Sequence, residues 1–273
     1  MSLVVAQIHG EGISLVADTK ITFYNDDTKT RQVFGNASPK LAILRDDVVI
    51  GVAGDNPDRA MHRLVSLRDR AIEDLIRAML DTGYASFILA ALSPSLTLLQ
   101  VSDGQVDDRS SIRRAWIGDP AAFELFQQRY HEWSEDVDPA FRLMSSMQWL
   151  LSFNPVPSVG GYLTRVVTAG DGFRFVADPA TVGPWFLESL SQATADGVRL
   201  TLRVPDGGDP TGYQILPAVG RPPTIGALAY YVPQVGTAWL FRHESPWKAI
   251  TLKVDSMEEL IVAAAGHGQT IVG

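Results

Sequence analysis

The start of the chain carries residue types that could form a nucleophile and its base. Ser2 follows Met1 directly, and two strand-like runs come next, Leu3 to His9 and Ile13 to Asp18, joined by the turn Gly10-Glu11-Gly12. A serine hydroxyl is a weak nucleophile and needs a base that takes its proton. A free α-amine has a pKa of ~7.7–8.0, so part of it is unprotonated at neutral pH. If Met1 is removed, Ser2 therefore holds both groups, and the reaction needs no histidine.

Other common catalytic and binding patterns are missing from the sequence. It has no HExxH, no P-loop and no GxSxG, and Gly10-Glu11-Gly12 lacks the third glycine of a dinucleotide-binding turn. The absence of cysteine excludes disulfides, thiolate metal sites and a cysteine nucleophile. We interpret the five histidines as structural because they lack the spacing of metal ligands: His9, His62, His131, His243 and His267. A catalytic triad that includes a histidine stays open.

Composition narrows the class of protein. An apolar share of 46% and a charged share of 20% are those of an ordinary soluble globular chain. A net charge of −8 argues against a dedicated nucleic-acid-binding protein, which needs a basic face. The N-terminus lacks the pattern of a signal peptide, and no apolar run approaches the ~20 residues of a membrane helix. We therefore expect a cytoplasmic protein that binds neither nucleic acid nor a membrane.

The elements that must position Ser2 follow one another as strands, a helix, strands, two helices and strands. Strand-like runs are expected at 41–44, 48–53, 86–92, 96–101, 112–117, 162–168 and 173–176, and helices at 57–80 and after Asp119-Pro120 and Asp138-Pro139. The strands are rich in Val, Ile and Leu on both faces, which is typical of sheets that are buried on both sides. The order predicts an α+β fold and is compatible with a four-layer αββα sandwich, and with other α+β layouts.

The last third of the chain has a different character. Residues 179–273 are rich in turn residues, with short strand-like runs at 198–204, 213–216, 225–232, 237–241 and 249–254. A helix is expected from Ser256 to about Ala265, because Ser256 and Glu259 have capping-box spacing and Gly266 can end it. We therefore predict two parts, residues 1–178 and a mainly β extension over residues 179–273.

Three segments of residues 2–178 resemble the proteasome-type N-terminal nucleophile (Ntn) hydrolases, and above all their bacterial proteasome-like branch. "SLVVAQIHGEGISLVADTK" resembles the opening hairpin of that family, which puts Ser2 at the nucleophile, Asp18 at the acid and Lys20 where arginine is usual. "SPKLAIL" resembles the segment of the essential lysine, here Lys40. "VVIGVAGD" resembles the segment whose glycine amide forms the oxyanion hole, here Gly54. The spacing of the last two fits the family, whereas the stretch before Lys40 is several residues longer.

The resemblance implies a role for each of these residues. Lys40, kept charged by Asp18, would lower the pKa of the Ser2 hydroxyl and of its α-amine. The Gly54 amide would meet the developing oxyanion, and one such donor typically contributes ~2.7–4 kcal/mol. Taken singly, Lys40 also fits a solvated lysine at a strand end, and Asp18 a turn acid. As an ordered set, the residues favour the family fold.

Two further positions carry a weaker resemblance. Where the family has a serine, "WIGDPAAF" offers Asp119, which is more simply a helix N-cap. "PSVGGYL" resembles a loop that holds a later acid and serine of the family. Ser158 matches the serine, whereas Pro155 stands where the acid would be.

The expected function is that of a proteasome-like threonine/serine peptidase or amidohydrolase, with Ser2 as the nucleophile. The resemblance implies no metal or organic cofactor, a peptide or protein substrate, and a homo-oligomer built as a ring or a stack. The C-terminal extension could bind an unfoldase or another partner. Two alternatives are a catalytically inactive scaffold that serves assembly and an amidase that acts on a small-molecule amide.

Overall fold

The computed structural model shows a mixed α/β protein. It describes residues 2–20, 38–153, 156, 158–170, 172–182, 188–194, 197–203, 212–220, 226–233 and 236–272. Met1, Pro155 and most of the long stretch between Asp18 and Lys40 lie outside these residues.

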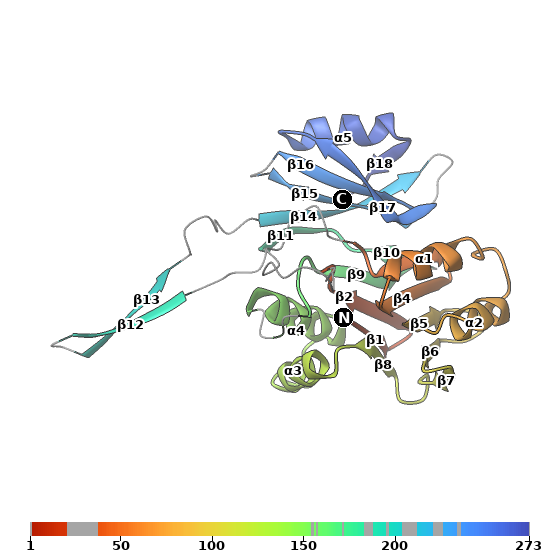
Figure 1. Ribbon diagram of the computed structural model, residues 1–273, viewed down its shortest axis with the longest axis horizontal. Coiled ribbons are helices and arrows are strands. Elements are labelled where there is room, and N and C mark those ends of the chain that lie inside the picture. Colours follow the sequence, from red (N-terminus) through yellow and green to blue (C-terminus); the bar gives the residue numbers. More distant parts are fainter. Residues whose placement is uncertain are drawn as a thin grey trace.

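Two five-stranded antiparallel sheets form the first part of the chain (Figure 1). One has the order β10-β9-β2-β1-β8, made of β1 (Leu3–His9), β2 (Gly12–Ala17), β8 (Arg114–Gly118), β9 (Thr164–Ala169) and β10 (Gly172–Phe175). The other runs from β3 to β7 in sequence order, made of β3 (Leu41–Arg45), β4 (Val48–Gly54), β5 (Ala85–Ala91), β6 (Thr97–Ser102) and β7 (Gln105–Asp108). The expected opening hairpin is present as β1 and β2. Strand β7 was not predicted, because its four residues are all exposed and show no apolar alternation.

The prediction of a single helix over residues 57–80 is wrong. The chain forms two helices there, α1 (Pro57–Val65) and α2 (Ile72–Leu80). Arg45 donates hydrogen bonds to the carbonyls of Arg68 and Arg70 in the connection, at 3.1 and 2.9 Å. Leu67, also in the connection, packs against the same apolar cluster as both helices. The apolar repeat therefore continues through the break and hides it. The next two helices, α3 (Pro120–His131) and α4 (Pro139–Phe153), begin where they were expected.

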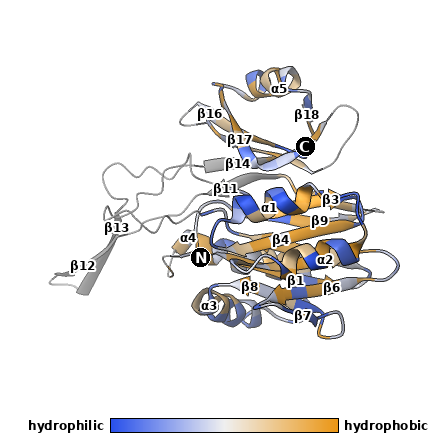
Figure 2. Cartoon of the chain, turned by 45° about the vertical axis from the view of Figure 1, so that its right-hand side comes forward, coloured by the Kyte–Doolittle hydropathy of each residue, from blue (hydrophilic) through white to orange (hydrophobic). Residues whose placement is uncertain are grey.

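Apart from the exposed edge strand β7, both sheets carry buried residues on both faces, since alternate residues of a strand point to opposite sides. On β1, Val4 and Ala6 pack against the other sheet, whereas Leu3 and Val5 pack against α3 and α4. The apolar cluster on the outer face of β4 is shared with α1 and α2. Figure 2 shows apolar strands at the centre and polar stretches on the helices. Ser2 thus begins a strand that is held between a helix pair and a second sheet.

The C-terminal part adds a third large sheet. Its order is β11-β14-β15-β16-β17 with β18 paired to β14, and its strands are β11 (Asp178–Val182), β14 (Gly212–Gly220), β15 (Ala227–Val232), β16 (Thr237–Arg242), β17 (Ser245–Lys253) and β18 (Gln269–Ile271). A separate hairpin joins β12 (Glu188–Thr194) and β13 (Gly197–Arg203). Helix α5 (Met257–Gly266) covers one face of the sheet, and the Ser256 hydroxyl oxygen accepts the Glu259 N–H at 3.2 Å. In Figure 1 this sheet lies above the two five-stranded sheets.

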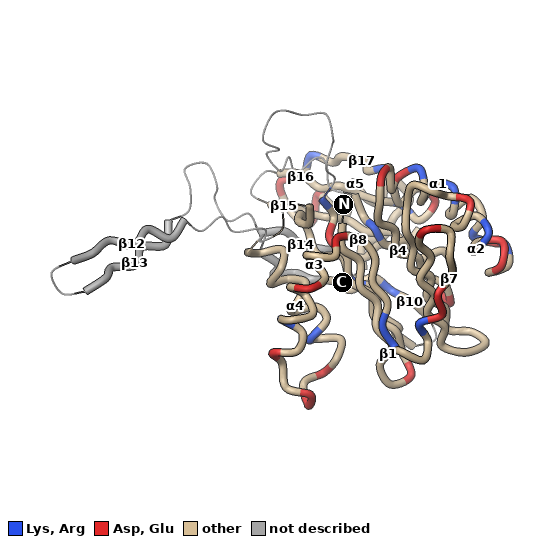
Figure 3. Tube along the Cα trace, turned by 60° about the horizontal axis from the view of Figure 1, so that its bottom comes forward, with Lys and Arg blue, Asp and Glu red and all other residues tan. Residues whose placement is uncertain are grey.

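Charged residues of both signs are interspersed along the outer helices, as the colours of α1 and α2 in Figure 3 show. Their ion pairs are exposed, for example Arg63 with Asp81 at 3.2 Å and Arg77 with Asp74 at 3.3 Å. Exposed pairs of this kind contribute only ~0–1 kcal/mol each. In the part of the chain that the structure describes, no helix is long and apolar enough to cross a membrane.

Candidate active site

The Asp18 carboxylate is the centre of the candidate site. It lies directly after β2 and is fully buried. One oxygen accepts the Leu3 N–H at 3.0 Å, and the other accepts the N–H groups of Lys20 and Gly160, each at 3.2 Å. The Asp18 N–H in turn donates to the Leu3 carbonyl at 3.2 Å. Asp18 therefore joins the residue after Ser2 to the loop that follows α4.

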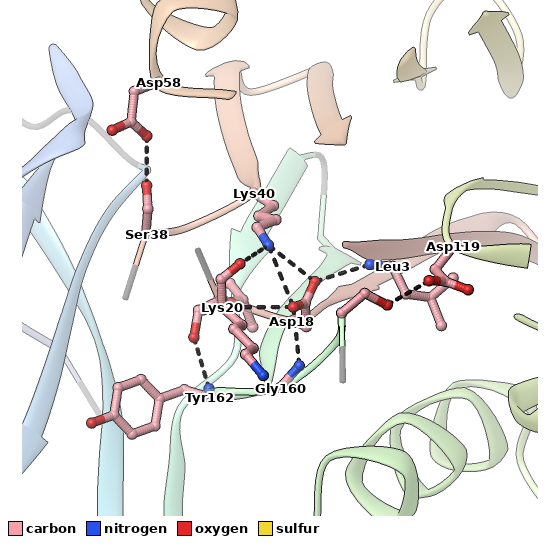
Figure 4. A network of polar contacts seen from close by, with 12 residues as sticks. Leu3, Asp18, Lys20, Ser38, Lys40, Asp58, Asp119, Gly160 and Tyr162 are labelled. Atoms are coloured by element: carbon pink, nitrogen blue, oxygen red, sulfur yellow. Dashed lines mark hydrogen bonds and ion pairs between the residues drawn. The ribbon is translucent and has the colours of Figure 1, made fainter. Parts of the chain in front are cut away.

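Lys40 is the cationic partner of Asp18 (Figure 4). It stands just before β3 and is 1% exposed, so the alternative of a solvated lysine is wrong. Its Nζ lies 3.3 Å from both Asp18 carboxylate oxygens and donates to the Lys20 carbonyl at 2.5 Å. Burial lowers the pKa of Lys40 from its usual value, and the charge and hydrogen bond of Asp18 oppose that shift. The pair is thus shielded from solvent and held from several sides.

Ser2 is 3% exposed, and its backbone is fixed by the two aspartates. Its carbonyl accepts the Asp119 N–H at 2.8 Å, and the next N–H, that of Leu3, is bound by Asp18. The question of whether Met1 is removed falls outside the described residues. The main chain at the start of β1 is therefore held on both sides of Ser2.

Asp119 is the N-cap of α3 and also binds Ser158. One carboxylate oxygen caps α3 by accepting the N–H groups of Ala121 and Ala122, at 2.9 and 3.2 Å. The other accepts the Ser158 hydroxyl at 2.5 Å. Burial raises the pKa of Asp119, but the bonds from Ser158 and the helix amides outweigh burial, and the net pKa is lowered. Ser158 thus has a carboxylate partner, although it is not the acid that the resemblance led us to expect three residues earlier.

Neutralising Asp119 should change how stability depends on pH. A carboxyl group with a lowered folded pKa stabilises the protein above its unfolded pKa of ~3.9, and this stabilisation is lost as the pH falls through the folded pKa. Asp119→Asn keeps an N-cap oxygen. Urea denaturation at a series of acidic pH values should therefore give a flatter acid limb for Asp119→Asn, and a partly flattened one for Ser158→Ala. Equal slopes for both variants and the parent protein would contradict the assignment.

Gly54, the candidate oxyanion donor, ends β4 at the same end of the sheet as Lys40. The Val52 N–H donates to the Lys40 carbonyl at 2.9 Å, which places the end of β4 beside the start of β3. Gly54 has a φ of +138°, and an added Cβ would lie 2.6 Å from the Tyr84 carbonyl oxygen. The backbone here therefore requires glycine.

Several residues that surround the pair were not predicted. The Gly160 N–H and the Lys20 carbonyl bind Asp18 and Lys40 through main-chain atoms, which leave no side-chain signature in a sequence. The double glycine of "PSVGGYL" was the available signal, because Gly161 has a φ of +83° and a Cβ there would lie 2.5 Å from the Thr19 hydroxyl oxygen.

A second polar pair lies close to Lys40. The Ser38 hydroxyl donates to Asp58 at 3.0 Å. Burial raises the pKa of Asp58, and the Ser38 bond and the Lys40 charge oppose the increase.

Among the described residues, no group of three or more His, Asp or Glu side chains is arranged to hold a metal ion.

The likeness of this chain to known proteins is found among solved structures. No protein-family model matches the chain, and no curated protein sequence matches it. Among solved structures, the chain is similar to the crystal structure of eukaryotic HslV from Trypanosoma brucei, with 17% sequence identity and a TM-score of 0.46. That likeness covers 60% of this chain and 98% of HslV. The functional proposal is therefore built on the arrangement of the residues themselves.

Proposed function

We propose that the chain is a proteasome-like N-terminal nucleophile hydrolase in which Ser2, exposed by removal of Met1, attacks an amide carbonyl. The observation that carries this proposal is the Asp18 carboxylate, which binds both the N–H next to Ser2 and the buried Lys40 ammonium. The fold that goes with this function is a four-layer αββα sandwich of the Ntn type over residues 1–178, followed by a C-terminal β extension.

The proposed reaction begins when the α-amine of Ser2 takes the hydroxyl proton as Oγ attacks the carbonyl carbon. The Lys40 ammonium lowers the pKa of that hydroxyl, because a nearby positive charge favours the anionic form. The Gly54 amide donates to the oxyanion of the tetrahedral intermediate. The C–N bond then breaks, the leaving amine takes the proton from the α-ammonium, and water hydrolyses the acyl-serine ester. This chemistry needs neither a metal nor an organic cofactor.

Asp119 and Ser158 are proposed to orient the freed amine. The Asp119 N–H binds the Ser2 carbonyl, and its carboxylate binds Ser158, so both lie beside the start of β1. A carboxylate favours a cationic neighbour, which suits an amine that must accept a proton. Asp119 would then supply, from the start of α3, the charge that Pro155 cannot.

The substrate and assembly follow from the same proposal. We propose peptides or proteins as substrates, in the cytoplasm, and a homo-oligomer arranged as a ring or a stack. The extension would serve an unfoldase or another partner. An inactive scaffold and a small-amide amidase remain the competing functions, and the experiment below separates all three.

Two preparations that differ only in Met1 test the function. Protein that begins at Ser2 should hydrolyse fluorogenic peptides ~10²–10⁴-fold faster than protein that keeps Met1, because the free amine supplies general-base catalysis. Ser95→Ala, in an exposed loop, serves as the matched serine control and should leave the rate unchanged. Turnover of small amides alone would support the amidase. Equal, background rates in both preparations would support the scaffold and contradict the proposal.

A further inference from the structure

The C-terminal sheet contributes side chains to the core of the first part of the chain. Strand β15 is buried along its whole length. On one face, Ala229 and Tyr231 pack in the cluster beneath α5. On the other, Leu228, Tyr230 and Val232 join the cluster that lies between the two five-stranded sheets. The extension therefore reaches into the interior that surrounds the candidate site.

Tyr230 is the polar member of that inward face. It is completely buried, and its hydroxyl lies 2.5 Å from the Thr164 hydroxyl oxygen. Its ring stacks on Tyr162 with centroids 5.2 Å apart and meets Phe241 edge-on at 5.6 Å. Burial raises the pKa of the Tyr230 hydroxyl far above its usual range, and the negative charge of Asp18 adds to this effect. The hydroxyl thus stays protonated as a hydrogen-bonding group.

Two of the residues that Tyr230 contacts, Thr164 and Tyr162, are each bonded to a neighbour of Asp18 in the sequence. Thr164 is the cross-strand partner of Ala17, the residue before Asp18. The Tyr162 N–H donates to the hydroxyl oxygen of Thr19, the residue after Asp18, at 2.7 Å. A displacement of the Tyr230 side chain would therefore act on both neighbours of the carboxylate at once.

We propose that Tyr230 is a positioning residue, supplied by the C-terminal sheet, that sets the geometry of the Asp18–Lys40 pair through Thr164 and Tyr162. The catalytic part of this inference rests on the function proposed above, whereas the structural coupling does not. The C-terminal sheet is then part of the framework of the site and not an appendage to it.

Tyr230→Phe tests the inference, with Tyr231→Phe as its matched control. Tyr231 is the next residue on β15, is also buried, and packs on the opposite face under α5. We expect Tyr230→Phe to lower kcat about tenfold with KM unchanged, since one buried hydrogen bond is lost, and to shift the pH–rate profile. Tyr231→Phe should change none of these. Unchanged kcat and pH profile in Tyr230→Phe, or equal effects of the two variants, would overturn the catalytic part.

A double-mutant cycle distinguishes failure of this inference from failure of the proposed function. The free energy of unfolding is measured for Tyr230→Phe, Asp18→Asn and the double variant. Residues in one hydrogen-bonded group give non-additive effects, whereas independent residues add. Non-additive changes in the free energy of unfolding would support the positioning role of Tyr230. If the parent protein hydrolysed no substrate, that finding would contradict the proposed function only. Additive effects would overturn the positioning role even in an active enzyme.

Discussion

Replacing Lys40 with methionine is expected to lower the hydrolysis rate by ~10²–10⁴-fold and the free energy of unfolding by ~3–5 kcal/mol. In the proposed mechanism the rate falls because the hydroxyl of Ser2 loses the positive charge that favours its ionisation. The stability falls because the Asp18 carboxylate, which is fully buried, is left without its cation. Leaving one charge of a buried pair uncompensated is among the most costly single changes in a protein core.

Two further variants separate these effects. Adding Asp18→Asn to Lys40→Met removes the stranded charge, so the double variant should regain stability but stay inactive. Lys248→Met, on an exposed part of β17, should match the parent protein in both measurements. Urea denaturation and peptide hydrolysis are measured on the same preparations. A fully active Lys40→Met protein would contradict the role given to the pair.

Gly118→Ala is expected to destabilise the protein by at least about 3 kcal/mol and to disturb Ser2. Gly118 has a φ of +111°, where a side chain alone costs ~1–3 kcal/mol. An added Cβ would also lie 1.8 Å from the Ser2 carbonyl oxygen, a contact that only a backbone shift can relieve. Because Gly118 pairs with Leu3 across β8 and β1, that shift would move the start of β1. Activity should fall together with stability.

Gly10→Ala provides the control for backbone strain without a clash. Gly10 has a φ of +54°, and nothing lies within 4 Å of an added Cβ. Its cost should be only that of the left-handed conformation, ~1–2 kcal/mol, with unchanged activity. The urea denaturation midpoints of Gly118→Ala and Gly10→Ala are compared, and that of Gly118→Ala should be the lower. If they were equal, the close approach of Gly118 to Ser2 would not matter as described.

Local patterns predicted the parts of the fold that depend on neighbouring residues. The β1–β2 hairpin followed from alternating apolar residues around a glycine turn, and the start of α3 followed from Asp119-Pro120. The candidate residues Asp18 and Lys40 came from a resemblance of short segments. The structure now shows these two in contact, 22 residues apart in sequence. Gly54 also came from a resemblance, and the pairing of β3 with β4 sets the end of its strand beside Lys40.

Contacts between distant segments were out of reach of such patterns. The link between Ser158 and Asp119 joins residues 39 apart, and the one between Thr164 and Tyr230 joins residues 66 apart. The break between α1 and α2 was hidden because the apolar period runs through it. No sequence pattern predicted that the extension contacts the residues around the site, because a buried tyrosine in a strand is common in any protein core.

Covalent labelling of Ser2 tests the central claim most directly. Protein from its native host is treated with a peptide epoxyketone or a β-lactone, and intact mass and peptide mapping follow. We predict that Met1 is absent and that one adduct forms on Ser2, with none on Ser2→Ala. Full retention of Met1, or an unmodified Ser2 in protein that has lost Met1, would contradict the account.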